Sequence, residues 1–93
     1  MYTLKLSTKA KKDFKKIGKD PINNNLTKAV LKLLKENGVD AIPKTMSPHL
    51  LKGNYKNCWE CHIKPDLLII WFQIKNPNEI TIIRIGSHSD LFR

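Results

Sequence analysis

The chain has 93 residues, which limits it to one domain with one modest hydrophobic core. Its formal net charge is +9, from 17 Lys and Arg against 8 Asp and Glu, which favours nucleic acid or the ribosome as partner over a merely solvated basic surface. The longest apolar run, residues 67–72, is far too short to span a membrane, and the first residues have no signal-peptide pattern, so we expect a cytoplasmic protein.

Residues 2–18 predict a strand followed by a short basic helix. Apolar and polar side chains alternate over residues 2–7, as they do in a β-strand. Either Ser7 or Thr8 is a suitable N-cap for the helix, and Gly18 is a suitable end. Apolar side chains recur between these caps at helical spacing: Ala10, Phe14 and Ile17. Most other positions of this helix are lysine, so one of its faces is basic.

Residues 20–37 predict a second helix. Asp20 is a capping residue, Pro21 fits the first turn, and Asn37 with Gly38 closes the helix. The helix has an apolar stripe that we expect to be core: Ile22, Leu26, Val30, Leu33 and Leu34. Two consecutive helices of this kind are expected to form a hairpin packed on a sheet.

The second half of the chain predicts a loop and then three strands. Residues 39–52 contain two prolines and predict a loop. Strands are expected at 54–64, 67–74 and 79–87, and the middle one is apolar on both faces, as a central strand is. The order strand–helix–helix–strand–strand–strand predicts one α+β domain over residues 1–93. In it, two N-terminal helices cover one face of an antiparallel sheet, and the first strand joins an edge of that sheet.

The strand at 54–64 contains a Cys-x-x-Cys-His string, which also occurs at covalent haem sites and, without the histidine, in redox dithiols. Alternation places Tyr55, Trp59, Cys61 and Ile63 on one face and Lys56, Cys58, Glu60 and His62 on the other. The two cysteines then point to opposite faces and cannot hold one ligand or pair with each other. We therefore expect no haem, no metal and no disulfide here, with Cys61 as a small core side chain.

Polar residues near the strand ends form a candidate site for RNA cleavage. Glu60 and His62 share a face of one strand, Arg84 and His88 share parity on another, and all are expected at one end of the uncovered face. Cleavage by internal transfer needs a base for the 2′-OH proton, a cation beside the phosphorus and an acid for the leaving 5′ oxygen. Histidine and arginine suit these roles, and Asp66 can act as a base or orient a histidine. The alternative is an ordinary polar surface.

Three segments of the chain resemble the YafQ branch of the RelE-type toxins of bacterial type II toxin–antitoxin systems. They read HLLKGNYK at 49–56, ECHIKPDLL at 60–68 and RIGSHSDLF at 84–92. The resemblance implies a small α+β fold of the microbial-ribonuclease kind. It also implies an mRNA interferase that enters the ribosomal A site, cuts mRNA without a metal or other cofactor, and is inhibited by a cognate antitoxin. The basic surface predicts that this antitoxin is acidic.

The resemblance also implies which residues act. The catalytic set would be His49, His62, Asp66, Arg84 and His88. In it, His88 is a general acid or base, His62 and Asp66 serve the opposite proton transfer, Arg84 holds the phosphorane, and His49 positions substrate. Substrate-binding residues would be Lys52, Lys56, Glu60 and Phe92, and the lysines of the two helices would contact 16S rRNA.

Two positions depart from the family pattern. Leu67 stands where some members have a tryptophan, so base stacking at that position is not expected. Phe92 stands near the C terminus where other relatives have a tyrosine, so it can stack but cannot transfer a proton. Two other functions stay open on the sequence: a basic module that binds RNA or the ribosome without cutting, and a co-repressor partner of an antitoxin.

Overall fold

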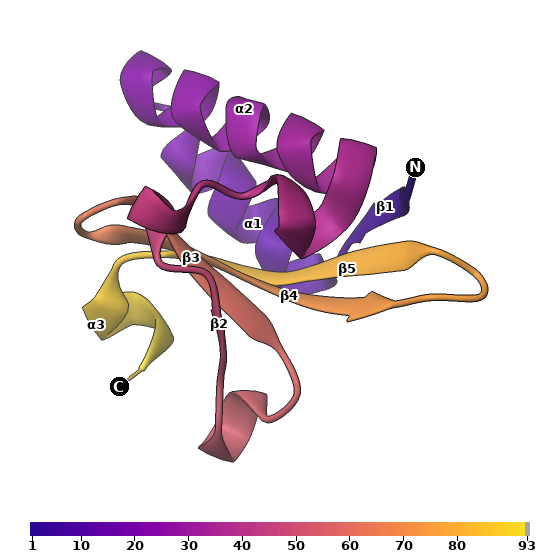
Figure 1. The fold of residues 1–93 in the computed structure, drawn as a ribbon. Helices are drawn as coiled ribbons and strands as arrows, with labels where there is room; N and C mark the ends of the chain where they lie inside the picture. The colour runs from indigo at the N-terminus through magenta and orange to yellow at the C-terminus, as the bar shows by residue number, and fades with distance from the viewer. Residues whose placement is uncertain (93) are drawn as a thin grey trace.

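The computed structural model describes residues 1–92 and has an α+β architecture, with two long helices on one side of a five-stranded sheet (Figure 1). The helices are α1 (Thr8–Ile17), α2 (Pro21–Asn37) and α3 (His88–Leu91). The strands are β1 (Thr3–Leu6), β2 (His49–Leu50), β3 (Trp59–Lys64), β4 (Leu67–Ile74) and β5 (Glu79–Gly86). Short 3₁₀ turns cover Gly38–Ala41, Lys44–Met46 and Gly53–Tyr55.

The strand order is β1-β5-β4-β3-β2, so β4 is central, as predicted from its apolar sequence. Strands β2 to β5 pair antiparallel with their neighbours, whereas β1 runs parallel to β5 at the edge. The expected edge position of the first strand is confirmed. The sheet is therefore mostly rather than wholly antiparallel.

Both predicted helix starts are confirmed by their capping contacts. The Ser7 hydroxyl accepts a hydrogen bond from the Ala10 amide at 3.0 Å, and it donates to the carbonyl of Ile83 at 2.7 Å. The Asp20 carboxylate accepts from the Ile22 amide at 2.9 Å, with proline as the first residue of α2. These caps satisfy amides that a helix leaves unpaired at its start, and the Ser7 cap also fastens α1 to β5.

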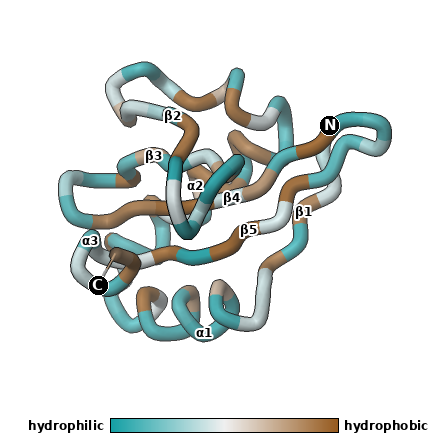
Figure 2. Tube along the Cα trace, turned by 90° about the horizontal axis from the view of Figure 1, so that it is seen from below, coloured by the Kyte–Doolittle hydropathy of each residue, from teal (hydrophilic) through white to brown (hydrophobic). Residues whose placement is uncertain are grey.

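Helices α1 and α2 bury the main core against the sheet, and apolar colour follows β4 in Figure 2. Fully buried side chains of this core include Val30, Leu34, Ile69, Trp71, Ile80 and Ile82. The opposite face of the sheet, here called the open face, carries a smaller buried cluster beneath α3: Cys58, Leu68, Ile70 and Leu91. Polar side chains on the open face are therefore not covered by α1 or α2.

Part of the predicted α2 stripe is not core. The side chains of Ile22 and Leu26 are 69% and 38% exposed, whereas Thr27 and Leu31 are buried. The apolar period extends toward the N terminus of α2 beyond the turns that contact the sheet, so periodicity alone overestimates the buried stripe.

Three boundaries also differ from prediction. The segment 39–52 contains the short strand β2 in addition to turns, and β3 begins at Trp59 because Gly53–Tyr55 forms a 3₁₀ turn. That turn breaks the alternation, so Tyr55 packs with the open-face cluster and not beside Trp59. The last strand ends at Gly86 because Ser87 caps α3, which begins at His88.

Candidate active site on the open face

Four strands place a row of side chains across the open face. His49 of β2 is opposite Glu60 of β3, Glu60 is opposite Ile70 of β4, and Ile70 is opposite Arg84 of β5. Directly opposed residues share a face of the sheet, and neighbouring strands lie about 4.8 Å apart. The row therefore brings together three of the residues predicted from the sequence, His49, Glu60 and Arg84, from segments far apart in the chain.

A β-bulge decides the face on which Arg84 lies. Along the β4–β5 pairing, Trp71 is opposite Ile82. The next residue of β4, Ile70, is opposite Arg84, which leaves Ile83 as an extra residue. Strict alternation from the buried Ile82 would turn Arg84 toward the helices; the extra residue turns it to the open face.

His49 and Glu60 form a close pair. Nε2 of His49 lies 3.2 Å from Oε1 of Glu60, and Nδ1 lies 2.7 Å from the carbonyl oxygen of Ser47. A carbonyl only accepts, so Nδ1 donates to it. Glu60 is 5% exposed, and its Oε2 has no hydrogen-bond partner among residues 1–92. Both ring nitrogens of His49 therefore have close partners, which fixes the ring and suits it to positioning substrate.

Asp66 and His88 are joined through the main chain. Oδ1 of Asp66 accepts from the His88 amide at 3.1 Å, and the Ser87 hydroxyl accepts from the Asp90 amide at 3.2 Å. The aspartate of the β3–β4 turn thus helps to fix the start of α3, which carries the histidine. The His88 ring lies against Phe92 one turn later, with ring centroids 4.9 Å apart.

Tyr55 also belongs to this group, although it was not predicted from the sequence as a site residue. Its ring meets Phe92 edge-on, with centroids 5.6 Å apart and planes at 84°, and its hydroxyl donates to the Leu91 carbonyl at 3.2 Å. The only signal in the sequence is an aromatic residue between two lysines, Lys52 and Lys56. Tyr55 and Phe92 together form an aromatic wall beside His88, of the kind on which bases stack.

Arg84 is held by Asp13 of α1, a second site residue that was not predicted from the sequence. Nε of Arg84 lies 2.7 Å from Oδ2 of Asp13, and Nη2 lies 3.2 Å from Oδ1. Hydrogen bonding to Asp13 raises the pKa of Arg84, with a smaller contribution from Tyr55 nearby, so the guanidinium stays charged. Asp13 is the one acidic residue in a helix rich in lysine, which is a signal in retrospect.

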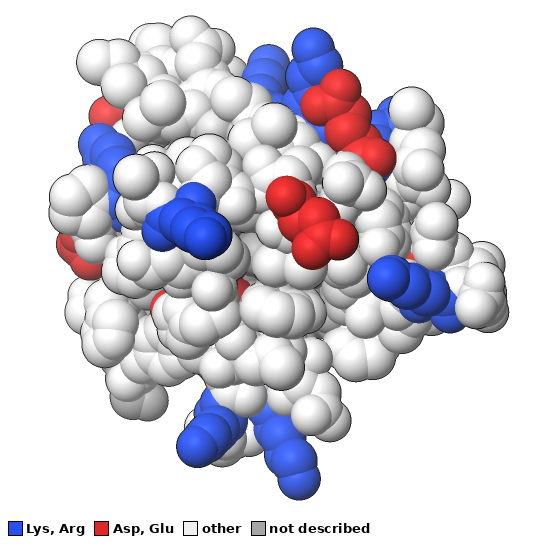
Figure 3. All heavy atoms as spheres, viewed as in Figure 1, with Lys and Arg blue, Asp and Glu red and all other residues white. Residues whose placement is uncertain are grey.

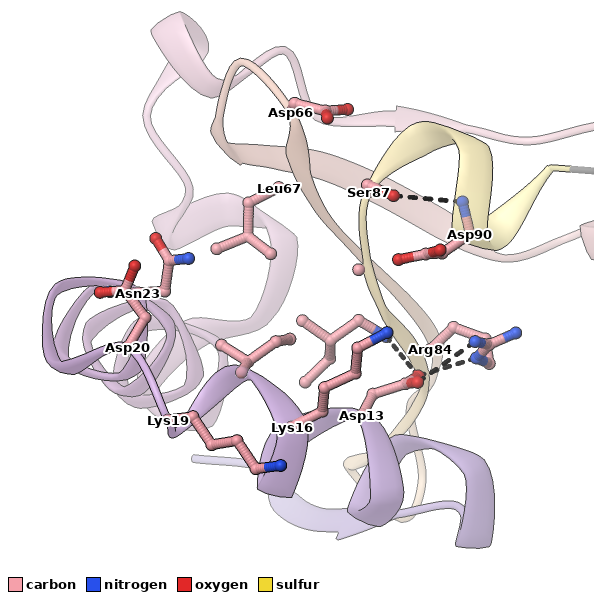
Figure 4. A pocket seen from close by; sticks show the side chains of 13 residues that line it. Asp13, Lys16, Lys19, Asp20, Asn23, Asp66, Leu67, Arg84, Ser87 and Asp90 are labelled. Carbon is pink, nitrogen blue, oxygen red and sulfur yellow. Dashed lines mark hydrogen bonds and ion pairs between the residues drawn. The ribbon is translucent and has the colours of Figure 1, made fainter.

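Arg84 and Asp66 also line a depression of about 590 Å³ between α1, α2 and α3 (Figure 4). Its other polar residues include Lys16, Lys19 and Ser87. The depression lies next to the row on the open face, because Arg84 belongs to both. It is large enough for part of an extended ligand.

The remaining predicted residues lie around this group. His62 is on the same face as Glu60, two residues along β3, and is half-buried, but it lines a separate hollow with Met46 and Lys64. Lys52 and Lys56 are exposed on either side of the 3₁₀ turn Gly53–Tyr55. In Figure 3, positive groups project at the bottom of the view, over the connection between β2 and β3.

The two cysteines lie on opposite sides of the sheet, as predicted, with Cys61 in β3 and Cys58 just before it. Cys61 is in the helix-covered core and Cys58 is in the open-face cluster, and both are free thiols. Burial raises the pKa of the Cys61 thiol to about 12, with Glu60 adding to the effect.

Within residues 1–92, no group of three or more His, Cys, Asp or Glu side chains is arranged to hold a metal ion, and no helix is long and apolar enough to cross a membrane.

Because only the thiolate reacts, we expect both cysteines to resist alkylation by iodoacetamide at pH 7.5 in the native protein. Labelling should become rapid in about 6 M urea, where burial no longer raises the pKa. Mass spectrometry after timed labelling measures this. A Ser89→Cys variant, at an exposed site, is the control that must label natively. Native labelling of Cys61 as fast as of this control would contradict its buried position.

Comparisons with known proteins give consistent matches. The family model described as "Bacterial toxin of type II toxin-antitoxin system, YafQ" matches residues 2–93. The structure of a mutant of Escherichia coli YafQ is similar with a TM-score of 0.87 and 25% identity, and 100% of each chain is covered. A metal-bound toxin from Helicobacter pylori has a TM-score of 0.84 and 36% identity, with 99% of this chain and 100% of that chain covered.

Two further structures extend the comparison. The Escherichia coli DinJ–YafQ complex matches with a TM-score of 0.85 and 25% identity, covering 100% of both chains. A YoeB/ParE toxin from Agrobacterium tumefaciens, at 15% identity and a TM-score of 0.77, shares the fold over 95% of this chain and 99% of that chain. No curated protein sequence matches the chain.

Proposed function

The chain belongs to the YafQ family of bacterial toxins of type II toxin–antitoxin systems, and on this basis we propose that it is a ribosome-dependent endoribonuclease that cuts mRNA in the A site. The match covers residues 2–93, so we take the whole chain as one toxin domain. The observation that supports the proposal most is the grouping on the open face. There an arginine, an imidazole, a carboxylate and two aromatic rings lie around one small helix, α3.

The proposed reaction is internal transfer of the phosphodiester. A base takes the 2′-OH proton, the 2′ oxygen bonds to phosphorus, and the bond to the 5′ oxygen breaks as an acid protonates that oxygen. The products are a 5′-hydroxyl end and a 2′,3′-cyclic phosphate, or a 3′-phosphate where water then opens the cyclic ester. Arg84 stabilises the extra negative charge on the phosphorane. This chemistry needs no metal ion in the site. We therefore expect cleavage to continue when EDTA removes transition metals while Mg²⁺ in excess of the EDTA keeps the ribosomes intact.

Each remaining residue is assigned a role by its position. His88 transfers one proton, and Asp66 or His62 transfers the other. His49, paired with Glu60, holds the substrate backbone, while Phe92 stacks on a base. Lys52 and Lys56 contact phosphates from the exposed edge of the site.

The charge of the surface suggests two macromolecular partners. The lysines of α1 and α2 would contact 16S rRNA when the toxin occupies the A site in the cytoplasm. A cognate acidic antitoxin would neutralise the same surface, as DinJ is found in complex with Escherichia coli YafQ. We propose that this complex also serves as a co-repressor, with the toxin as partner of a DNA-binding antitoxin.

Ribosome binding is expected to weaken steeply with salt. If about six phosphates are contacted, affinity should fall by about 10³-fold between 50 and 200 mM monovalent salt. Sedimentation with ribosomes at stepped salt concentrations measures the slope. Replacing Lys11 and Lys15 of α1 with glutamine should reduce the slope by about one per lost contact. A flat response would contradict the electrostatic docking.

Primer extension on a defined mRNA tests the function directly. The wild-type protein, free of antitoxin, is added to programmed ribosomes and, separately, to the same mRNA alone. We expect a cut within the A-site codon only when ribosomes are present. If folded protein that sediments with ribosomes gives no cut in either sample, the endoribonuclease proposal is contradicted. The result would then favour a non-catalytic module that binds RNA or the ribosome.

A further inference from the structure

The carboxylate of Asp13 is fixed from two sides. Oδ2 accepts from Nε of Arg84 at 2.7 Å and from the amide of Ile85 at 3.0 Å, while Oδ1 accepts from Nη2 at 3.2 Å. The amide lies on the edge of β5 beyond the last residue of β1, where α1 takes over as the neighbour. Three donors therefore hold one carboxylate, and one of them belongs to the rigid sheet.

This contact occupies two of the donors of Arg84, and the side chain of Tyr55 also interacts with the guanidinium. A guanidinium has five N–H groups, and Asp13 takes the Nε–H and one on Nη2. The three others lie on Nη1 and Nη2, where two parallel N–H groups match two oxygens of a phosphate. In Figure 4 the dashed contacts to Asp13 lie on one side of the guanidinium, and its remaining nitrogen points away from α1.

We propose that Asp13 is a positioning residue that presents the Nη1–Nη2 edge of Arg84 to the scissile phosphate, an inference that rests on the endoribonuclease function proposed above. The two side chains are 15% and 20% exposed, so water screens the contact only in part. An arginine fixed before the reaction does not have to reorganise as charge develops on phosphorus. Without Asp13, the long side chain would sample many orientations on the open face.

A purely structural role for Asp13 is the competing explanation, because the Ile85 contact also fastens α1 to β5. The two explanations differ in what they predict for cleavage when Arg84 is absent. A positioning residue acts only through Arg84, so its loss has no effect on an enzyme that lacks the arginine. A structural residue costs the same in either background.

The test is a double-mutant cycle of Asp13→Asn and Arg84→Ala, measured as single-turnover mRNA cleavage on programmed ribosomes. Asparagine keeps the shape and an acceptor oxygen for the Ile85 amide. We expect Asp13→Asn to lower the maximal rate by about 10- to 100-fold with little change in the half-saturating concentration. In the Arg84→Ala background the same change should have no further effect. Asp40→Asn is the matched control, since it changes an exposed carboxylate that does not line the depression.

Each outcome has one meaning. If the wild-type protein does not cleave, the proposed function is wrong, and the positioning role that rests on it falls with it. If wild type cleaves and Asp13→Asn matches it, or lowers the rate equally in both backgrounds, the positioning role is overturned. Should Asp13→Asn not fold, Asp13→Glu takes its place, since it keeps the charge and displaces the carboxylate by one methylene; an unchanged rate then overturns the proposal.

Discussion

Replacing His88 with alanine is expected to lower A-site mRNA cleavage by about 10²- to 10⁴-fold, because a positioned imidazole is proposed to transfer a proton in the rate-limiting step. The loss should be chemical and not structural. His88 is exposed, its ring contacts only Phe92 among the ring contacts found in residues 1–92, and its link to Asp66 uses the main-chain amide, which alanine retains. The free energy of unfolding should therefore change by less than about 0.5 kcal/mol.

Primer extension and urea unfolding on the same preparation separate the two effects. Ser89→Ala, on the exposed side of the same short helix, is the control for any disturbance of α3. Added imidazole should restore part of the activity of His88→Ala if only the proton-transfer group is missing. Full cleavage by His88→Ala would show that another group transfers the proton, and a large loss of stability would point to a structural role for the ring.

Much of the fold could be predicted because its signals are local. A capping serine before α1, an aspartate followed by proline before α2, and a glycine after it each act on the nearest turn of backbone. The central position of β4 followed from apolar side chains on both of its faces. The two-residue strand β2 had no such signal, because so short a strand forms only when β3 is beside it.

The site was less predictable because its geometry depends on distant parts of the chain. The face on which Arg84 lies depends on a bulge at Ile83, and counting alternate residues from Ile82 would have placed it under the helices. Its partner Asp13 is 71 residues away in the sequence, in a helix whose composition indicated only a basic surface. The position of Tyr55 required the 3₁₀ turn that precedes β3. The types of residue in the site could therefore be predicted from the sequence, whereas the orientations of their side chains depend on tertiary contacts.

Replacing Gly38 with alanine is expected to reduce the free energy of unfolding by about 3 to 5 kcal/mol, from backbone strain of about 1–3 kcal/mol and overpacking of similar size. Gly38 has φ of 60° and ψ of −148°, a region that only glycine enters readily. A Cβ there would lie 2.7 Å from Nε2 of Gln73. The amide cannot move away, because Oε1 accepts from Val39 and Trp71 while Nε2 donates to Tyr2.

The chain offers a matched control at Gly53, which also has a positive φ, of 76°, but has no atom within 4 Å of an added Cβ. Gly53→Ala should cost only the left-handed strain, about 1 kcal/mol. Urea unfolding of both variants compares the two. Since a domain of this size has a total stability of only about 5 kcal/mol, Gly38→Ala should be largely unfolded at 37 °C while Gly53→Ala remains folded. Equal losses would mean that φ alone, and not the Gln73 network joining α2, β4 and the N terminus, forbids a side chain at position 38.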